Sequence, residues 1–151
     1  MILGDEYYMG LALAEAYAAA EEGEIPIGAV VVAPNGRILG RGHNQTERLS
    51  DVTAHAEMLA VSAAAQTLGG KYLAGCTLYV TIEPCPMCAG AIGWSQLSRI
   101  VIGAPDPKRG YTRIVRPGTT PFHPRAEVTE GVREGECRAV IQDFFISKRR
   151  K

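Results

Sequence analysis

The chain has 151 residues, of which 46% are hydrophobic and 21% charged, so it can bury a core without disulfides and is not a disordered protein. No apolar run approaches the roughly 20 residues of a membrane span. No Lys or Arg precedes residue 25, which excludes the basic start of a secretory signal. A formal net charge of zero argues against a protein that coats nucleic acid through bulk charge.

The first part of the chain predicts a helix followed by a hairpin. Residues 6–20 are rich in Ala, Leu and Glu, which favour a helix, and Gly23 is expected to end it. Residues 25–33 and 37–42 have the pattern of extended strands. Because Asn35-Gly36 between them is a strong turn signal, these strands should pair antiparallel.

The next segment predicts a loop, a helix and a central strand. Residues 45–52 are polar and form the expected loop. Thr53 is predicted to cap a helix that continues to Leu68 and ends at Gly69-Gly70. Residues 76–82 are β-branched and mostly apolar, so we expect a strand in the middle of a sheet.

A second helix and another buried strand should follow. Pro84 is predicted to lie in the first turn of a helix that runs to about residue 96, since proline there forfeits no helical hydrogen bond. Residues 99–104 predict a buried strand. Residues 105–125 are rich in proline and lack a clear period, so they are interpreted as a long surface loop with a functional role.

The last elements complete an α/β arrangement. Residues 127–132 predict a strand, and residues 134–146 predict an amphipathic helix. The residues expected to face inward from this helix are Val140, Ile141, Phe144 and Phe145. Helices interleaved with strands in this order predict one domain over residues 1–151, a three-layer α/β/α sandwich around a mixed sheet of about five strands.

Two short motifs stand at the starts of two predicted helices, where ligands usually bind. They are Thr53-Ala54-His55-Ala56-Glu57 and Glu83-Pro84-Cys85-Pro86-Met87-Cys88. Cys85 and Cys88 should project to one side of their helix, whose N-terminus favours the thiolates that metals require. With His55 they form a sulfur and imidazole set that suits one Zn²⁺ and leaves a fourth position for water.

Glu57 distinguishes a catalytic zinc site from a structural or redox-active one. Two residues from His55, it is poorly placed as a ligand of the same ion but well placed as a base beside a bound water. Cys-x-x-Cys alone is also found in structural, redox-active or accidental settings. A structural zinc would need a fourth protein ligand from His43, His123 or Cys76, and the spacing selects none of them.

The remaining cysteines suggest a reducing compartment. Four cysteines in a chain without a secretory signal are better interpreted as metal ligands or buried apolar groups than as disulfides. Cys76 and Cys137 are therefore expected to be core residues. We expect a cytoplasmic protein with no membrane partner and no nucleotide cofactor.

Several further stretches extend the pattern over nearly the whole chain. They are Glu24-Ile25-Pro26-Ile27-Gly28-Ala29-Val30, Leu78-Tyr79-Val80-Thr81-Ile82 before the cysteine motif, Ala89-Gly90-Ala91 after it, Thr129-Glu130-Gly131-Val132, Glu136-Cys137 and Phe144-Phe145. Together with the two motifs they resemble the bacterial tRNA-specific adenosine deaminases, within the cytidine and deoxycytidylate deaminase superfamily. The resemblance implies a homodimer that hydrolyses the wobble adenosine of a tRNA anticodon arm to inosine.

The resemblance also implies roles for individual residues. It makes His55, Cys85 and Cys88 the ligands of one zinc ion per chain and Glu57 the proton shuttle for attack at C6 of adenine. The residues matching substrate-binding positions are Asn44 and the backbone N–H of Ala56 at the base, Ile27 and Pro84 at the pocket wall, and Asp106 near the nucleotide 5′ to the target. One departure is residues 122–125, Phe-His-Pro-Arg, where this family often has Asn-His-Arg.

Two alternatives remain. A deaminase of free guanine or cytosine would share both motifs, but residues 99–125 carry six bases against one acid and residues 148–151 are all basic, which favours a polyanionic substrate. A non-catalytic, zinc-stabilised RNA-binding module is the alternative from another class. Glu57 argues against it, because a structural zinc site has no use for an acid so close to its ligand.

Overall fold

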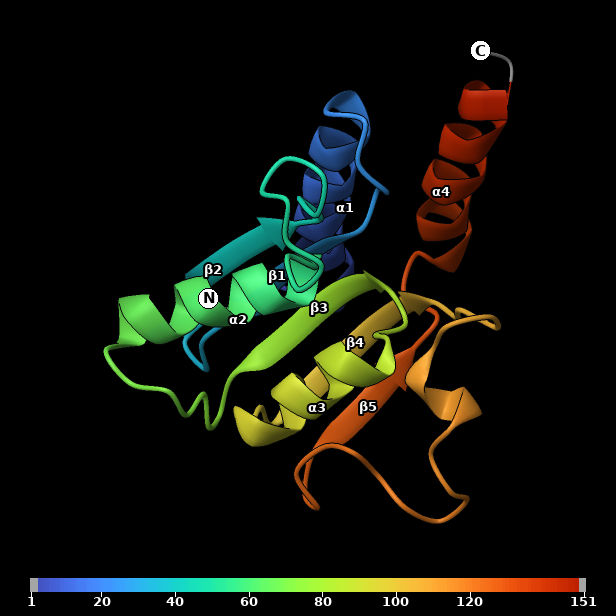
Figure 1. Ribbon diagram of the computed structural model, residues 1–151. Helices are drawn as coiled ribbons and strands as arrows, with labels where there is room; N and C mark the ends of the chain where they lie inside the picture. The colour runs from blue at the N-terminus through green and yellow to red at the C-terminus, as the bar shows by residue number, and fades with distance from the viewer. Residues whose placement is uncertain (1–2, 150–151) are drawn as a thin grey trace.

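The computed structural model describes residues 3–149. It shows a central five-stranded sheet with helices on both faces (Figure 1). The strands in sheet order are β2 (Ile38–His43), β1 (Gly28–Val32), β3 (Thr77–Ile82), β4 (Arg99–Ala104) and β5 (Glu127–Glu130). The helices are α1 (Asp5–Glu21), α2 (Ala56–Leu68), α3 (Pro86–Trp94) and α4 (Glu134–Arg149). The predicted three-layer α/β/α sandwich is confirmed.

The core has two halves, one on each face of the sheet. Alternate strand residues point to opposite faces, so Val30 and Val101 pack with α1 and α4, whereas Val31 and Ile102 pack with α2 and α3. All four valine and isoleucine side chains are at most 1% exposed. Burial of this kind, on both faces of the central strands, accounts for their nearly continuous apolar sequences.

The strand directions bring several strand ends to one edge of the sheet. β1 pairs antiparallel with both β2 and β3, so β2 and β3 run parallel to each other, and β3, β4 and β5 are parallel. The carboxyl ends of β2, β3 and β4 therefore share an edge, and α2 and α3 begin there (Figure 1). This is the edge where open α/β sheets bind ligands.

Glycines allow α2 to lie very close to the sheet. A Cβ atom at Gly40 would overlap the backbone of Ala60, and one at Gly42 would overlap the backbone of Ala56. Only glycine permits this separation. The close approach brings the start of α2 beside the end of β2.

The structure corrects the predicted starts of the two helices that follow the His55 and Cys85 motifs. α2 begins at Ala56, so Thr53 does not cap it; the Thr53 hydroxyl donates to Asp51 instead. α3 begins at Pro86, so Pro86 rather than Pro84 occupies its first turn. The reason is shared: His55 and Cys85, directly before these helices, have extended backbones and are the N-terminal caps.

The last helix is longer and less buried than its pattern predicts. In α4 only Cys137 and Val140 are buried, and Phe145 is 42% exposed, so its predicted inward orientation is wrong. The C-terminal half of α4 extends beyond the sheet, which leaves it no face to cover (Figure 1). Lys148 and Arg149 of the predicted basic tail are exposed at its end, and residues 150–151 lie outside the described residues. Within residues 3–149 no helix has the length and apolar character needed to cross a membrane.

Candidate metal centre and active site

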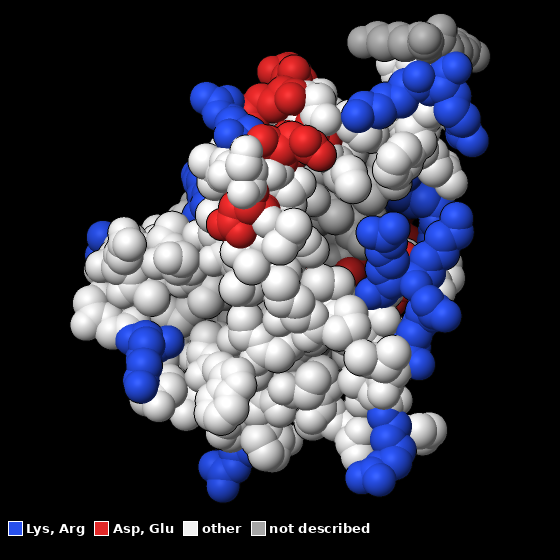
Figure 2. All heavy atoms as spheres, in the orientation of Figure 1, with Lys and Arg blue, Asp and Glu red and all other residues white. Residues whose placement is uncertain are grey.

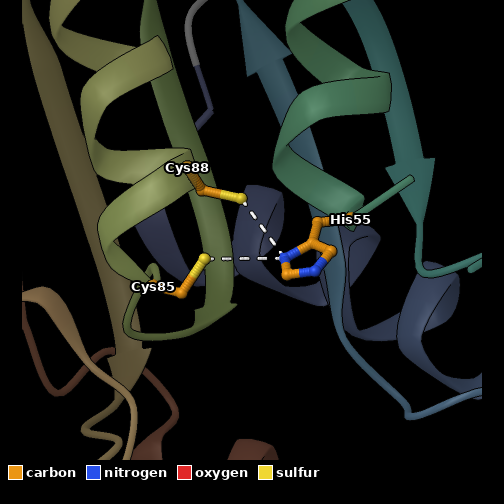
Figure 3. A group of neighbouring side chains, drawn as sticks. All are labelled: His55, Cys85 and Cys88. Carbon is orange, nitrogen blue, oxygen red and sulfur yellow. Dashed lines mark hydrogen bonds between the residues drawn. The ribbon is translucent and has the colours of Figure 1, made fainter. Parts of the chain in front are cut away.

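Three potential metal ligands converge from the starts of α2 and α3. His55 caps α2, Cys85 caps α3, and Cys88 lies in the first turn of α3. The His55 Nδ1 atom is 3.6 Å from the Cys85 Sγ and 3.5 Å from the Cys88 Sγ (Figure 3). All three ligand atoms lie within 4.8 Å of one another.

The spacing of these atoms fits Zn²⁺. A tetrahedral zinc with bonds of about 2.3 Å to sulfur and about 2.0–2.1 Å to nitrogen places a sulfur and a nitrogen ligand about 3.6 Å apart. Both observed S···N distances match that value. The donor set also matches, since zinc accepts thiolate and imidazole together.

No fourth protein ligand joins the group among residues 3–149. His43 bonds to Glu15 and Glu22, at 2.9 and 3.0 Å, and His123 accepts a hydrogen bond from the backbone of Arg125. Cys76 is buried in the core, as expected. Three protein ligands are the arrangement of a catalytic zinc, whereas a structural zinc is closed by four.

The two thiols differ in acidity because they contact each other. Hydrogen bonds from Cys88 and from His55 lower the pKa of Cys85 to about 4, against the effect of burial. The contact with Cys85, together with burial, raises the pKa of Cys88. The same thiolate raises the pKa of His55. Bound Zn²⁺ favours the thiolate form of both cysteines.

Glu57 is a buried carboxyl group beside these ligands. It lies in the first turn of α2 and is only 4% exposed. Burial raises the pKa of Glu57 to about 7, although its contacts with its own backbone N–H, His55 and Cys88 oppose the rise. A carboxyl group with a pKa near neutrality both accepts and donates protons readily at physiological pH.

The end of β2 contributes Asn44, which is 6% exposed. The Asn44 Oδ1 accepts a hydrogen bond of 2.8 Å from the backbone N–H of Ala56. The Ala56 N–H is therefore occupied by Asn44, and the Asn44 side-chain amide is the donor left for a ligand. Ile27, at the start of β1, is partly buried and packs against both halves of the core.

The segment after β4 closes the opposite side of the site. Pro84 is buried, and its carbonyl accepts a hydrogen bond from the Tyr111 N–H at 2.9 Å. The Asp106 Oδ1 accepts hydrogen bonds from the backbone N–H groups of Lys108 and Arg109, so this carboxylate shapes the turn in which it lies.

A groove of about 320 Å³, called the basic groove after the basic residues around it, adjoins Cys85. Its lining includes Lys108, Arg109, Arg113 and Ile114 from the segment after β4. Figure 2 shows Lys and Arg side chains gathered over this segment and along α4. The positive charge expected from residues 99–125 is thus partly concentrated beside the metal centre.

Sequence reasoning assigned no role to two buried carboxyl groups, one that holds the loop after β2 and one that lies beside Cys85. Glu24 is 2% exposed and accepts the backbone N–H groups of Glu47 and Arg48, at 3.1 and 2.8 Å. Glu83 is 7% exposed and holds the segment after β4. In the sequence each of these acids is marked only by its position next to an apolar strand. That position does not reveal which groups the carboxyl binds.

His55, Cys85 and Cys88 all lie in the part of the chain that matches a known family. Residues 3–104, more than half of the chain, match the model of the cytidine and deoxycytidylate deaminase zinc-binding region. This chain belongs to that deaminase family. The prediction of one zinc ion per chain is confirmed by this match and by the grouping of His55, Cys85 and Cys88.

Relatives of this deaminase cover nearly its whole length. It is 47% identical over 149 residues to the tRNA-specific adenosine deaminase of Bacillus subtilis (strain 168). The alignment covers 97% of this chain and 92% of the relative. A solved structure from a study of A-to-I editing by tRNA:A34 deaminases at the wobble position of transfer RNA has a TM-score of 0.81 at 42% identity. That match covers 89% of this chain and 98% of the other. The guanine deaminase of Nitrosomonas europaea has a TM-score of 0.78 at 26% identity, with 95% of this chain and 86% of that one covered.

Proposed function

We propose that this protein is a zinc-dependent hydrolytic deaminase that converts adenosine to inosine at the wobble position of a tRNA anticodon. The observation that carries the proposal is the three-ligand centre with a buried carboxyl group beside it, in a chain that is 47% identical to a tRNA-specific adenosine deaminase. The identity extends past the shared motifs into the basic segment and α4, because the match covers 97% of this chain.

The residues divide the chemistry between them. We assign His55, Cys85 and Cys88 as the ligands of a zinc ion, which when bound lowers the pKa of a water molecule toward neutrality. The Glu57 carboxylate takes a proton from the water that attacks C6 of adenine and delivers it to N1. Glu57 then takes the remaining proton from the new C6 hydroxyl and gives it to the amino group, which leaves as ammonia while C6 becomes a carbonyl.

The base is held from the β2 side of the site. We assign the Asn44 amide as a donor to the base, with its Oδ1 held by Ala56. Ile27 and Pro84 line the pocket wall, and Asp106 lies near the nucleotide 5′ to the target. The basic groove beside Cys85 supports an RNA substrate, because phosphates contact Lys and Arg.

We further propose that the protein is a cytoplasmic homodimer that pairs through α3. The outward face of α3 is apolar throughout: Met87 is 38% exposed, Trp94 is 84% exposed, and Gly90 and Ala91 between them are partly exposed. α3 contains no charged residue. An exposed apolar helix face of this kind is typical of a protein interface.

Turnover of matched substrates tests the activity. The zinc-loaded protein should deaminate an anticodon stem-loop much faster than free adenosine, guanine or cytosine at the same concentration. Wobble adenosines already lie in a loop, so the RNA supplies an unstacked base together with phosphates for the basic groove. Faster turnover of guanine or cytosine would overturn the tRNA assignment while leaving the zinc deaminase chemistry intact. A protein that binds RNA and zinc but turns over none of these substrates would be a binding module.

A further inference from the structure

Glu83 links the metal centre to the segment that carries the basic groove. It follows β3 directly and lies two residues before Cys85. Its Oε1 accepts the Asp106 N–H at 3.2 Å. Its Oε2 accepts the Thr112 N–H at 3.0 Å and the Thr112 hydroxyl at 2.7 Å. All three donors therefore come from the segment between β4 and β5.

The segment wraps closely around this carboxyl group. Gly110 is buried, and a Cβ atom there would overlap the Glu83 Oε2. The Gly110 N–H bonds to the Asp106 carbonyl, and the next residue bonds back to Pro84. A side chain at position 110 would displace either the carboxyl group or the turn, so the glycine and the acid fit each other.

Glu83 does not form an ion pair with the basic side chains of the groove, because its oxygens accept hydrogen bonds from other groups. Glu83 is bound by backbone N–H groups and one hydroxyl, not by Lys or Arg. Among residues 3–149 the ion pairs do not include Lys108, Arg109 or Arg113. The buried acid thus fixes the backbone from which these cations project, beside Cys85.

We propose that Glu83 is a positioning residue for RNA binding: by tethering Asp106 and Thr112 it holds Lys108, Arg109 and Arg113 where the phosphates of the bound RNA pass the metal centre. This assignment rests on the proposed RNA substrate. A carboxylate that merely stabilised the fold would affect stability and turnover together. A positioning residue affects the strength of substrate binding instead.

The first arm of the test uses the protein alone. Glu83→Gln removes an acceptor, Thr112→Val removes one donor, and Thr112→Ser retains it as a matched control. Limited trypsin digestion should cut Glu83→Gln faster after Lys108 and Arg109 than wild type, with zinc content and melting temperature measured alongside. Thr112→Ser should be cut at the wild-type rate. Equal cutting of wild type, Glu83→Gln and Thr112→Val would overturn the tether, whatever the substrate proves to be.

The second arm measures turnover of an anticodon stem-loop. For Glu83→Gln we expect KM to rise about tenfold, as loss of hydrogen bonds to a charged group predicts, with a much smaller change in kcat. The rise for Thr112→Val should be smaller, and log KM should depend less steeply on log salt concentration in both variants. A fall in kcat at unchanged KM, or loss of zinc, would show that Glu83 acts on the metal centre and overturn the proposal. A wild-type protein without stem-loop turnover would instead refute the proposed function, and the trypsin result would still decide the tether.

Discussion

The side chain of Asn44 and the backbone N–H of Ala56 form a buried hydrogen bond of 2.8 Å that joins the end of β2 to the start of α2. Asn44 thus supplies, from twelve residues away, a side-chain acceptor for the first N–H group of the helix that carries Glu57 and follows the cap residue His55. The bond satisfies one of the free N–H groups of the first helical turn. It also fixes the Asn44 side chain beside the start of α2, the helix that directly follows His55.

Two substitutions of Asn44 separate its cap from its proposed contact with the base. Asn44→Ala should lower the free energy of unfolding by about 1 kcal/mol, as loss of a cap does, and should also lower activity. Asn44→Asp keeps the acceptor for Ala56 but loses the amide donor, so it should lose activity while keeping more stability. Chemical denaturation and turnover of the stem-loop measure the two effects. An active Asn44→Asp variant would contradict the contact with the base.

Removal of a metal ligand should reduce zinc content and stability together. Cys85→Ala and Cys88→Ala each leave two protein ligands, so zinc measured per chain should fall well below one and the melting temperature should decrease. Cys76→Ala is the control, because Cys76 is also a buried thiol but lies in the core away from the ligand group. Full zinc in either ligand variant would exclude that cysteine from the centre.

The local features of the fold could be predicted from the sequence. Apolar strands, the Asn35-Gly36 turn and the left-handed Gly69 that ends α2 each depend on neighbouring residues. The grouping of His55, Cys85 and Cys88 was also predictable, since their spacing is part of the two motifs. A motif at a helix start is a local signal with a direct chemical meaning.

The features that could not be predicted depend on partners distant in the chain. Nothing near Asn44 indicates that its side chain, rather than that of Thr53, accepts a free N–H group at the start of α2, because the bond spans the loop after β2. Glu83 likewise binds a segment more than twenty residues later. Phe145 fits an amphipathic pattern, but it is exposed because α4 extends past the sheet. The length of that extension is a property of the assembled fold.

Breaking the apolar face of α3 should test the proposed dimer. Trp94 is 84% exposed in the single chain, so Trp94→Glu should place a charge in the interface and disrupt pairing without unfolding the protein. Light scattering should give the mass of a dimer for wild type and of a monomer for Trp94→Glu at micromolar concentration. Tyr17→Glu, on α1 and 52% exposed, should remain a dimer. A monomeric wild type would rule out the proposal.

His43 should make stability depend on pH above about 6.5, the pKa of histidine in the unfolded chain. Burial lowers the pKa of His43, but its hydrogen bonds to Glu15 and Glu22 outweigh that effect and raise it. A raised folded-state pKa stabilises the protein fully below the unfolded value of about 6.5, and this stabilisation is lost as pH rises through the folded pKa. The free energy of unfolding should therefore fall over that range in wild type. His43→Gln should lack this part of the pH dependence, and an unchanged profile would show that His43 does not titrate there.

Replacing Glu57 by Gln should separate the proton shuttle from the metal centre. The amide has nearly the same shape as the carboxyl group but carries no proton between acceptor sites, so kcat should fall by about 10²–10⁴-fold. Zinc content should stay near one per chain, because Glu57 is not one of the three grouped ligands. The fold should be retained, since burial already opposes the charged form of this side chain. Glu47→Gln, an exposed acid in the loop after β2, serves as the control and should keep wild-type kcat. Turnover of the stem-loop by zinc-loaded Glu57→Gln at the wild-type rate would mean that another group moves the proton.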